Sequence, residues 1–535
     1  MIEIGVGKKG GSAVKSIIWV TAVAAMLMFS IVMLTSCDGE ELGIQNDEKS
    51  EESAEISSEK SGSSSNADHG SLYKDVNKDI SDDGLSLQYN FSNQSTVYST
   101  NSLLYFFNRD GNRLECEKRI VIAGESEHIL KKAIEQLALG PKVKGLEAVI
   151  PEGVKVEKVE CYNNIVNVYL SKEFLEAKDL LIARAALVNT VLGAKPEADY
   201  VKIYVDGYEL TDNGKEDGLV LGLLSKYPEG LEEIKAREFE KFSGKDIVHI
   251  YREIYFQDQN RRFLVPEIRH IVVKQGGVAE AVVEELLKGP SIQDHGLYPT
   301  MPKGTQLLDI NYVEDSQSSK GIELYFSKEF DSAFDNEINS EFMMIGSLTH
   351  SLTGLPGVDW IKIYYQNEKG EYVDTPIMTL DLQRKFGKDS LPFLLGRRIK
   401  VYFSDKDVMN LVPEYRVISQ SSEDVATEIM NELIEGPMED EHIGVIPEHL
   451  TIDDVSVWIE NKTAFVNLPS SINGPRLGST GETMVLYSIV NSLTDPVNAE
   501  NVKQVQFLVD GKYVEEFGNM SLAEPFVRNP ALIKE

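Results

Sequence analysis

Cysteine, histidine and clustered carboxylates are the side chains of this chain whose chemistry could support a catalytic or metal site. Eight histidines are scattered through 535 residues, and the His-Glu-x-x-His spacing of a helical zinc site does not occur. The acidic run 439–441 followed by His442 offers ligand types that suit a metal, but a solvated loop is the favoured interpretation. No cysteine is matched with a histidine that recurs along the chain, and no glycine-rich phosphate loop opens a strand–helix unit. The sequence therefore predicts no catalytic residue, no metal site and no cofactor.

Cys37 has the clearest chemical context of the three cysteines. It follows an unbroken apolar run from Ile17 to Met33, which three lysines precede. The segment Leu34-Thr35-Ser36-Cys37 resembles a bacterial lipobox, in which the cysteine is lipidated and becomes the mature N-terminus. A transmembrane anchor is the alternative, but 17 residues are at the short limit for a hydrocarbon core of about 30 Å, and an anchor leaves Cys37 unexplained. We therefore expect residues 1–37 to be a lipoprotein signal peptide and the lipid on Cys37 to hold the protein at the extracytoplasmic face of the cell membrane.

The two other cysteines, Cys116 and Cys161, leave two alternatives open. They could form one disulfide in an oxidising compartment, or be two small buried apolar side chains, and the second is favoured. Two cysteines do not make the disulfide framework of a small secreted domain.

Acidic residues dominate the charge of the chain. Lys plus Arg number 53 and Asp plus Glu number 86, so the net charge is −33. A field of this sign repels phosphate backbones, which excludes nucleic acid as a partner. Residues 38–98 are acidic and rich in serine in their first half, and we expect them to be a disordered, extended tether.

The rest of the chain repeats one pattern three times. Aromatic pairs open the copies 150 and 147 residues apart, and a Gly-Pro pair and a further proline follow in the same order. The recurring positions are Tyr105, Phe106, Gly140, Pro141 and Pro151 in the first copy, Tyr255, Phe256, Gly289, Pro290 and Pro302 in the second, and Tyr402, Phe403, Gly436, Pro437 and Pro447 in the third. Each copy has the size of a domain.

The elements that position these residues can be predicted from the hydrophobic pattern. In the third copy Val425, Ile429 and Leu433 share one helical face, and Gly436-Pro437 ends that helix. Two strands, a second helix and a closing strand follow in every copy. The predicted fold is α+β, with three tandem small modules that each have a mixed β-sheet with two helices on one face.

The third copy carries a family resemblance most clearly. Its segments Tyr402–Asp405, Leu411–Glu414, Glu435–Pro437 and Ile446-Pro447 resemble the GerMN domain of GerM-like spore germination and sporulation lipoproteins. The resemblance covers residues 100–225, 248–385 and 397–530, and leaves 226–247 and 386–396 as linkers. It implies a non-enzymatic extracytoplasmic protein that helps to assemble an envelope complex in sporulation or germination, and the module core is also similar to the ring-building motif.

Two repeated polar or aromatic features are candidates for contact with partners. Glu and Arg recur two residues apart on a predicted strand, where both point to one side. These candidate interface residues are Glu117, Arg119, Glu267, Arg269, Glu414 and Arg416. An exposed charge ladder within the sheet is favoured over a contact with a neighbouring domain. For the Tyr-Phe pairs, core packing of both rings is favoured over one exposed anchor.

The expected partners are the membrane, through the lipid on Cys37, and envelope proteins of a sporulation or germination complex. Self-association into a homo-oligomer is left open. An envelope lipoprotein that modulates a sensor kinase is the alternative function, and a cell-wall hydrolase is a weaker one because no carboxylate pair is evident in the sequence.

Overall fold

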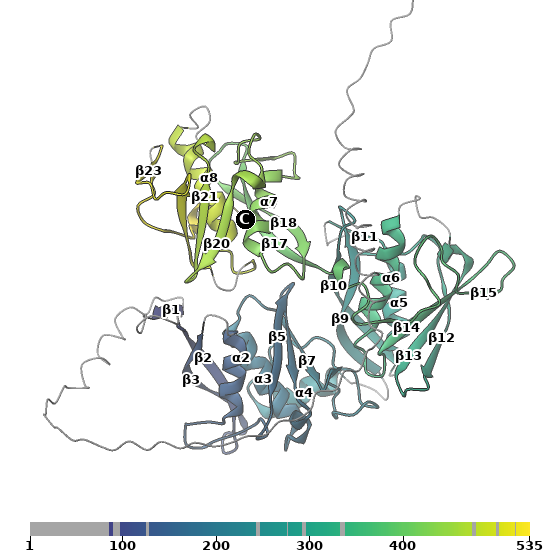
Figure 1. Ribbon diagram of the computed structural model, residues 1–535. Coiled ribbons are helices and arrows are strands. Elements are labelled where there is room, and N and C mark those ends of the chain that lie inside the picture. The colour runs from purple at the N-terminus through teal and green to yellow at the C-terminus, as the bar shows by residue number, and fades with distance from the viewer. Residues whose placement is uncertain are drawn as a thin grey trace, which may run out of the picture. The chain divides into compact units, whose positions relative to one another are not determined.

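The computed structural model describes residues 85–88, 97–124, 128–241, 247–274, 276–291, 296–331, 338–472, 478–498, 502–518 and 520–534 (Figure 1). These residues all belong to one compact unit, Val76–Glu535. Cys37, the apolar run and most of the predicted tether lie outside the described residues. Within the described ranges, no helix has the length and apolarity needed to cross a membrane.

Each module starts with a long antiparallel hairpin and continues into a mixed sheet. The first module contains β1 (Leu85–Gln88), β2 (Val97–Asn108), β3 (Arg113–Gly124), α2 (Ile129–Ala138), β4 (Leu146–Glu147), β5 (Val156–Tyr162), β6 (Ile165–Leu170), η1 (Lys172–Glu176), α3 (Leu180–Ala194), β7 (Tyr200–Val205), β8 (Tyr208–Glu209) and α4 (Leu231–Lys241). The second contains β9 (Ile247–Asp258), β10 (Leu264–Lys274), α5 (Val278–Lys288), β11 (Leu297–Tyr298), β12 (Leu307–Glu314), β13 (Lys320–Phe326), η2 (Lys328–Asp331), α6 (Ile338–Leu352), β14 (Trp360–Gln366), β15 (Tyr372–Val373), β16 (Phe386–Gly387) and η3 (Pro392–Leu394).

The third module repeats the order of elements. It contains β17 (Gly396–Asp405), β18 (Leu411–Ser419), α7 (Val425–Glu435), β19 (His442–Ile443), η4 (Ile452–Asp454), β20 (Ser456–Glu460), β21 (Thr463–Leu468), η5 (Ser470–Ile472), α8 (Gly478–Leu493), β22 (Gln504–Val509), β23 (Glu516–Phe517), β24 (Met520–Ser521), β25 (Phe526–Val527) and η6 (Pro530–Leu532). Buried apolar side chains form a separate main core in each module.

The α+β class is confirmed, but the hairpin of each module forms a sheet separate from the mixed sheet, and the third module has a further two-stranded sheet, β23–β24. In the first module, β2 and β3 pair with each other and β5-β6-β7-β8 form the second sheet. Strands β6 and β7 are parallel because α3 connects them, whereas β5 and β6 are joined by a two-residue turn. Asn163 and Asn164 in that turn have φ of 52° and 63°, the left-handed conformation that a tight hairpin requires.

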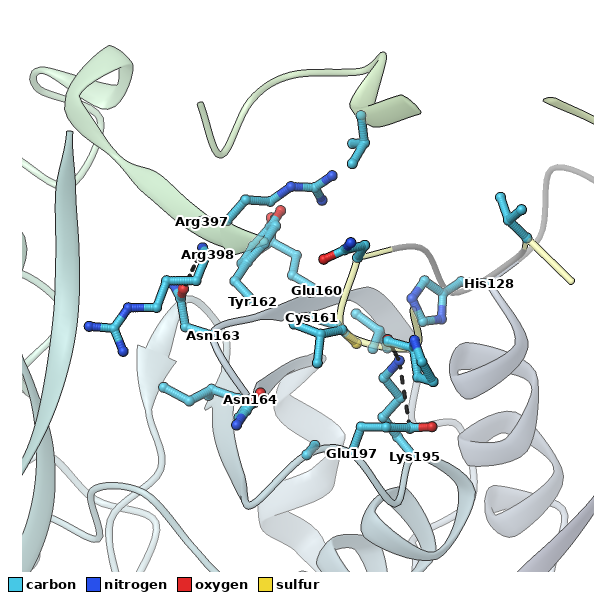
Figure 2. Close-up of a pocket in the computed structure, with 18 of the residues that line it drawn as sticks. His128, Glu160, Cys161, Tyr162, Asn163, Asn164, Lys195, Glu197, Arg397 and Arg398 are labelled. Atoms are coloured by element: carbon cyan, nitrogen blue, oxygen red, sulfur yellow. Dashed lines mark hydrogen bonds and ion pairs between the residues drawn. The ribbon is translucent and has the colours of Figure 1, made fainter. Parts of the chain in front are cut away.

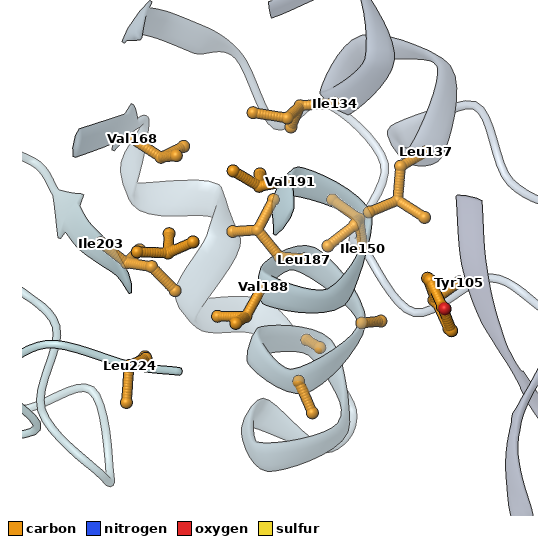
Figure 3. Close-up of a cluster of buried hydrophobic side chains, with 14 of the residues drawn as sticks. Tyr105, Ile134, Leu137, Ile150, Val168, Leu187, Val188, Val191, Ile203 and Leu224 are labelled. Carbon is orange, nitrogen blue, oxygen red and sulfur yellow. The ribbon is translucent and has the colours of Figure 1, made fainter. Parts of the chain in front are cut away.

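Helix α3 lies between the hairpin and the mixed sheet. Figure 3 shows Leu187 and Val188 of this helix with Ile203 of β7 on one side and Tyr105 of β2 on the other. Residues around the whole circumference of α3 are buried, so its sequence shows no polar stripe. Because α3 has no polar face, the hydrophobic pattern did not indicate that this helix packs between two separate sheets.

A hydroxyl from the second helix occupies the open edge of each hairpin. The backbone N–H of Tyr105 donates to Thr190 Oγ1 of α3 at 3.0 Å. The equivalent bonds, also 3.0 Å long, join the N–H of Tyr255 to Ser351 and the N–H of Tyr402 to Ser492. An unpaired strand edge is a site of unwanted strand pairing, and the helix covers it.

The chain leaving each module returns to the same place on the hairpin. Leu114 N donates to the carbonyl oxygen of Glu229 at 2.7 Å, and Leu264 forms a bridge with Leu395. In the third module Leu411 forms the same bridge with Ile533. We call 229–230, 395 and 533–534 the exit segments, and they close each module beyond its last long strand.

Both predicted linkers pack onto the preceding module. Helix α4 contributes Ile234 to the core of the first module. Its buried Glu238 pairs with Arg184 and accepts a 2.9 Å hydrogen bond from Tyr227. Leu391 and Leu394 belong to the core of the second module.

Candidate functional site

The repeated Glu-x-Arg residues form an ion pair in every module, which is buried in the first and third modules and has a half-buried arginine in the second. We call it the Glu–Arg clasp. In the first module Arg119 Nε donates to Glu117 at 2.6 Å, and another nitrogen of its guanidinium donates to the carbonyl oxygen of Gly140 at 2.6 Å. Glu117 accepts the backbone N–H groups of Lys142 at 2.8 Å and Val143 at 3.0 Å. The clasp thus ties strand β3 to the loop that follows α2.

The second and third clasps repeat this arrangement. Arg269 pairs with Glu267 and donates to the carbonyl oxygen of Gly289 at 2.8 Å. Arg416 pairs with Glu414 at 2.5 Å and donates to the carbonyl oxygen of Gly436 at 3.0 Å. In each clasp the guanidinium also lies over the ring of the repeated phenylalanine, with 5.3–5.7 Å from its central carbon to the ring centroid.

The clasps correct the prediction of an exposed charge ladder or domain contact at these six residues. The side chains of Glu414 and Arg416 are 4% and 2% exposed. The partners described for them lie in the third module. Burial alone would raise the pKa of Glu414, but hydrogen bonds from Met438, His442 and Arg416 outweigh it and lower the pKa. The pKa of Glu117 is lowered in the same way by Arg119, against the opposing effect of burial. The carboxylates of Glu117 and Glu414 are therefore held ionised as fixed structural groups.

The other repeated motifs surround the clasps. Phe106, Phe256 and Phe403 are fully buried, and Tyr105 and Tyr402 are at most 4% exposed, which agrees with core packing. Tyr255 of the second pair is only half-buried. Gly140, Gly289 and Gly436 have φ of 81°, 78° and 88°, as the end of a helix requires. Pro141, Pro290 and Pro437 follow these glycines, and Pro151, Pro302 and Pro447 each start a turn after the next short strand.

The two described cysteines are both thiols, with no disulfide between them in the part of the chain that the structure covers. Cys116 is exposed on β3, which corrects the favoured prediction that it is buried. Cys161 is half-buried at the end of β5, beside Tyr162 and Asn163 (Figure 2). It lines part of a cavity of about 700 Å³, together with His128, whose Nδ1 accepts the backbone N–H of Leu130 as the N-cap of α2.

The acidic run before His442 lies next to the third clasp. His442 Nδ1 lies 2.5 Å from Glu414 Oε1, and the backbone N–H of Glu439 donates to the same oxygen at 3.4 Å. Among the described residues no cluster of three His, Cys, Asp or Glu side chains has the geometry to hold a metal.

A pair of stacked tyrosines, which was not predicted from the sequence, occurs on the mixed sheet of the first module and again on that of the second. Tyr169 and Tyr204 are neighbours in the parallel β6–β7 pair, with ring centroids 4.7 Å apart and planes 6° apart. Tyr325 and Tyr364 occupy the same register in β13–β14, with values of 4.9 Å and 8°. We call each pair a tyrosine face. The recurring Ile-Tyr ending of the closing strands was the sequence signal for it.

The tyrosine face of the first module is covered by the second module. Lys388, which follows β16, places its ammonium nitrogen 5.1 Å from the ring centroid of Tyr169 and 4.4 Å from that of Tyr204. Beside it, Lys202 on β7 forms a 2.7 Å ion pair with Glu253 on β9. Burial and the neighbouring Lys202 lower the pKa of Lys388.

A second buried ion pair extends this contact. Arg252 on β9 pairs with Glu209 on β8, and both side chains are at most 2% exposed. The carboxylate of Glu209 also accepts the backbone N–H of Gly222 at 2.9 Å. The backbone N–H of Leu223 donates to the carbonyl oxygen of Tyr251 at 2.8 Å. Polar groups from both modules therefore pair within one interface, although Nε of Arg252 is buried there without a hydrogen-bond partner among the described residues.

Comparisons with known proteins bear on the repeated unit. The family model described as "Germane: Sporulation and spore germination" matches residues 103–211, 253–371 and 400–515, which together span more than half of the chain. No curated protein matches the chain.

Solved structures include similar proteins at low identity. The tandem GerMN domains of the sporulation protein GerM from Bacillus subtilis are 23% identical, with a TM-score of 0.23, over 52% of this chain and 97% of that chain. A putative lipoprotein from Clostridium perfringens is 24% identical, with a TM-score of 0.19, over 28% of this chain and 93% of that chain. The three matched segments of the family model, rather than these likenesses, identify the repeated unit.

Proposed function

Because this chain belongs to the Germane family of sporulation and spore germination proteins, we propose that it is a membrane-anchored scaffold of a spore envelope complex. The observation that carries the proposal is the family match in all three modules. The lipid on Cys37 would fix the chain to the extracytoplasmic face of the membrane, and the acidic tether would hold the modules away from the lipid surface.

The geometry of the repeated residues supports a binding role and no catalytic one. The polar side chains that recur in all three modules are the Glu and Arg of the clasps and the hydroxyls of the second helices, and both sets bond within the fold. The surfaces that remain available are sheet faces and aromatic side chains, which suit protein–protein contact. The contact between the first two modules demonstrates that a mixed-sheet face of this fold can receive a neighbouring module.

The anchor is tested by Cys37→Ala, with Cys116→Ala as the matched control that changes an exposed cysteine elsewhere. In cells, wild type and Cys116→Ala should remain with the membrane fraction after a high-salt wash, and Cys37→Ala should not be lipidated. Retention of an unmodified wild-type Cys37 on the mature protein would contradict the lipoprotein assignment.

The process is tested by the yield of heat-resistant, germinable spores from cells that lack the protein. We expect a strong drop that wild type and Cys116→Ala restore and Cys37→Ala does not. Normal spores from the deleted cells would exclude a role in spore formation or germination and favour an envelope-sensor role.

A further inference from the structure

The two tyrosine faces differ in what covers them. In the first module Tyr204 is 6% exposed because Lys388 and the second module lie on it. In the second module the face carries Tyr325 and Tyr364, which are half-buried, and Tyr372, which is 45% exposed. Tyr372 packs edge-on against Tyr325, with ring centroids 5.0 Å apart.

The chemistry of the second face matches that of the first. Lys362 on β14 lies over the ring of Tyr364, and its ammonium nitrogen is 4.8 Å from the ring centroid. In the first module, the ammonium nitrogen of Lys202 is 5.5 Å from the ring centroid of Tyr204. In the first module the companion of Lys202 is Glu253 from the next module. In the second module Lys362 pairs instead with Asp374 of its own module at 3.1 Å. The second face thus has its lysine paired within its own module, and its exposed ring is Tyr372, which borders the two half-buried stacked rings.

Carboxylates stand beside these rings. Glu323 lies on the same side of β13 as Tyr325 and accepts a 2.8 Å hydrogen bond from its hydroxyl. Asp309 is paired with Tyr325 across the β12–β13 ladder and is exposed. A stacked pair of rings with carboxylates at its border attracts an ammonium group through the ring quadrupoles and through charge.

We propose that the tyrosine face of the second module binds a lysine side chain presented by a segment of a basic partner protein. The contact of Lys388 with Tyr169 and Tyr204 is the precedent for this mode within the same molecule. A basic partner is favoured over a second copy because two chains that each carry a net charge of −33 repel each other. The proposal rests on the scaffold function for its biological setting, since it supplies one docking surface for that function.

A peptide taken from the chain itself is the probe. The peptide has the sequence of residues 384–391, Arg-Lys-Phe-Gly-Lys-Asp-Ser-Leu, and its matched partner has norleucine in place of the lysine at the position of Lys388. Norleucine keeps the four-carbon side chain of lysine and removes the ammonium group. Binding of labelled peptide to purified full chain is followed by fluorescence anisotropy at about 0.15 M salt, where long-range attraction is screened beyond roughly 8 Å. The measurement uses purified protein, so its failure is distinguishable from failure of the spore phenotype.

Tyr372→Ala and Tyr364→Phe are the informative variants. Tyr372→Ala removes an exposed ring, and we expect the dissociation constant for the lysine peptide to rise about threefold to tenfold, as it should for the norleucine peptide on wild type. Tyr364→Phe keeps the ring and should bind as wild type does. Tyr298→Ala is the control, since Tyr298 is a comparably exposed tyrosine on β11 of the same module.

Three results would overturn the proposal. The first is an absence of saturable peptide binding to wild type. The second is an equal loss of affinity in Tyr372→Ala and Tyr298→Ala, which would mean that the site is elsewhere. The third is a concentration-dependent dimer in sedimentation that Tyr372→Ala abolishes, which would assign the face to a second copy of this chain.

Discussion

Arg416 and Gly436 are joined by a 3.0 Å hydrogen bond from a guanidinium nitrogen to a backbone carbonyl oxygen. This contact links the strand β18 to the end of helix α7, whose last carbonyl groups have no partner within the helix. The same relationship holds between Arg119 and Gly140 and between Arg269 and Gly289. The repeated Glu-x-Arg sequence is therefore part of the folding core of each module.

Breaking one clasp should destabilise its module strongly. We expect Arg416→Gln to lower the free energy of unfolding of the third module by about 3–5 kcal/mol, because Glu414 would be left as a buried charge without its partner. Arg109→Gln is the matched control, since Arg109 forms an exposed ion pair with Glu147, and it should cost less than about 1 kcal/mol. Calorimetry of the full chain measures both, and equal effects would refute the structural role of the clasp.

Removing the hydroxyl that covers a strand edge should open that edge. Ser492→Ala leaves the buried N–H of Tyr402 without its acceptor, and we expect a loss of about 1–3 kcal/mol and faster hydrogen exchange at that amide. Thr483→Val on the same helix is the control, because its hydroxyl is exposed and bonds to the carbonyl oxygen of Ser479. Unchanged exchange at Tyr402 in Ser492→Ala would show that the bond does not protect the edge.

His350 should make the second module sensitive to acid. Burial lowers its pKa to about 4, against the opposing hydrogen bond to the carbonyl oxygen of Leu391. The folded state then disfavours the protonated ring, so the unfolded state binds more protons between about pH 4 and 6.5. Stability of this module should rise with pH across that window by up to about 1.4 kcal/mol per pH unit. His350→Gln should flatten this dependence in urea titrations, and an unaltered slope would exclude His350 as its source.

The two described thiols should react at different rates. Cys116 is exposed on β3 and Cys161 is half-buried, so we expect iodoacetamide to label Cys116 first in the native protein. Mass spectrometry of the unreduced protein should find both residues as thiols. A peptide pair linked through Cys116 and Cys161 would contradict the structure.

The element order, the three modules and the helix ends follow from the sequence because they rest on short-range patterns. Gly436 and its counterparts end a helix by local backbone geometry, and the hydrophobic period of α7 is visible in Val425, Ile429 and Leu433. The repeat itself made the domain organisation evident, since motifs recur at near-equal spacing.

The burial of the charged pairs could not be predicted in this way. Residues two apart on a strand point to one side, but the alternation of Glu117 and Arg119 does not show which side faces a helix. Their actual partners, such as the carbonyl oxygen of Gly140, are backbone groups about 20 residues away that carry no sequence signal. The tyrosine faces are a similar case, since Tyr169 and Tyr204 meet only after a helical crossover.

The exit segments have a consequence for the order in which the protein acquires its structure during synthesis. Leu114, Leu264 and Leu411 are fully buried, and each is closed by backbone that emerges at the far end of its module. The hairpin is synthesised first, but its contact with the exit segment can form only after the last residues of the same module have been synthesised. Such long-range closure slows folding, and the modules should complete their folding one after another in the order in which they are synthesised.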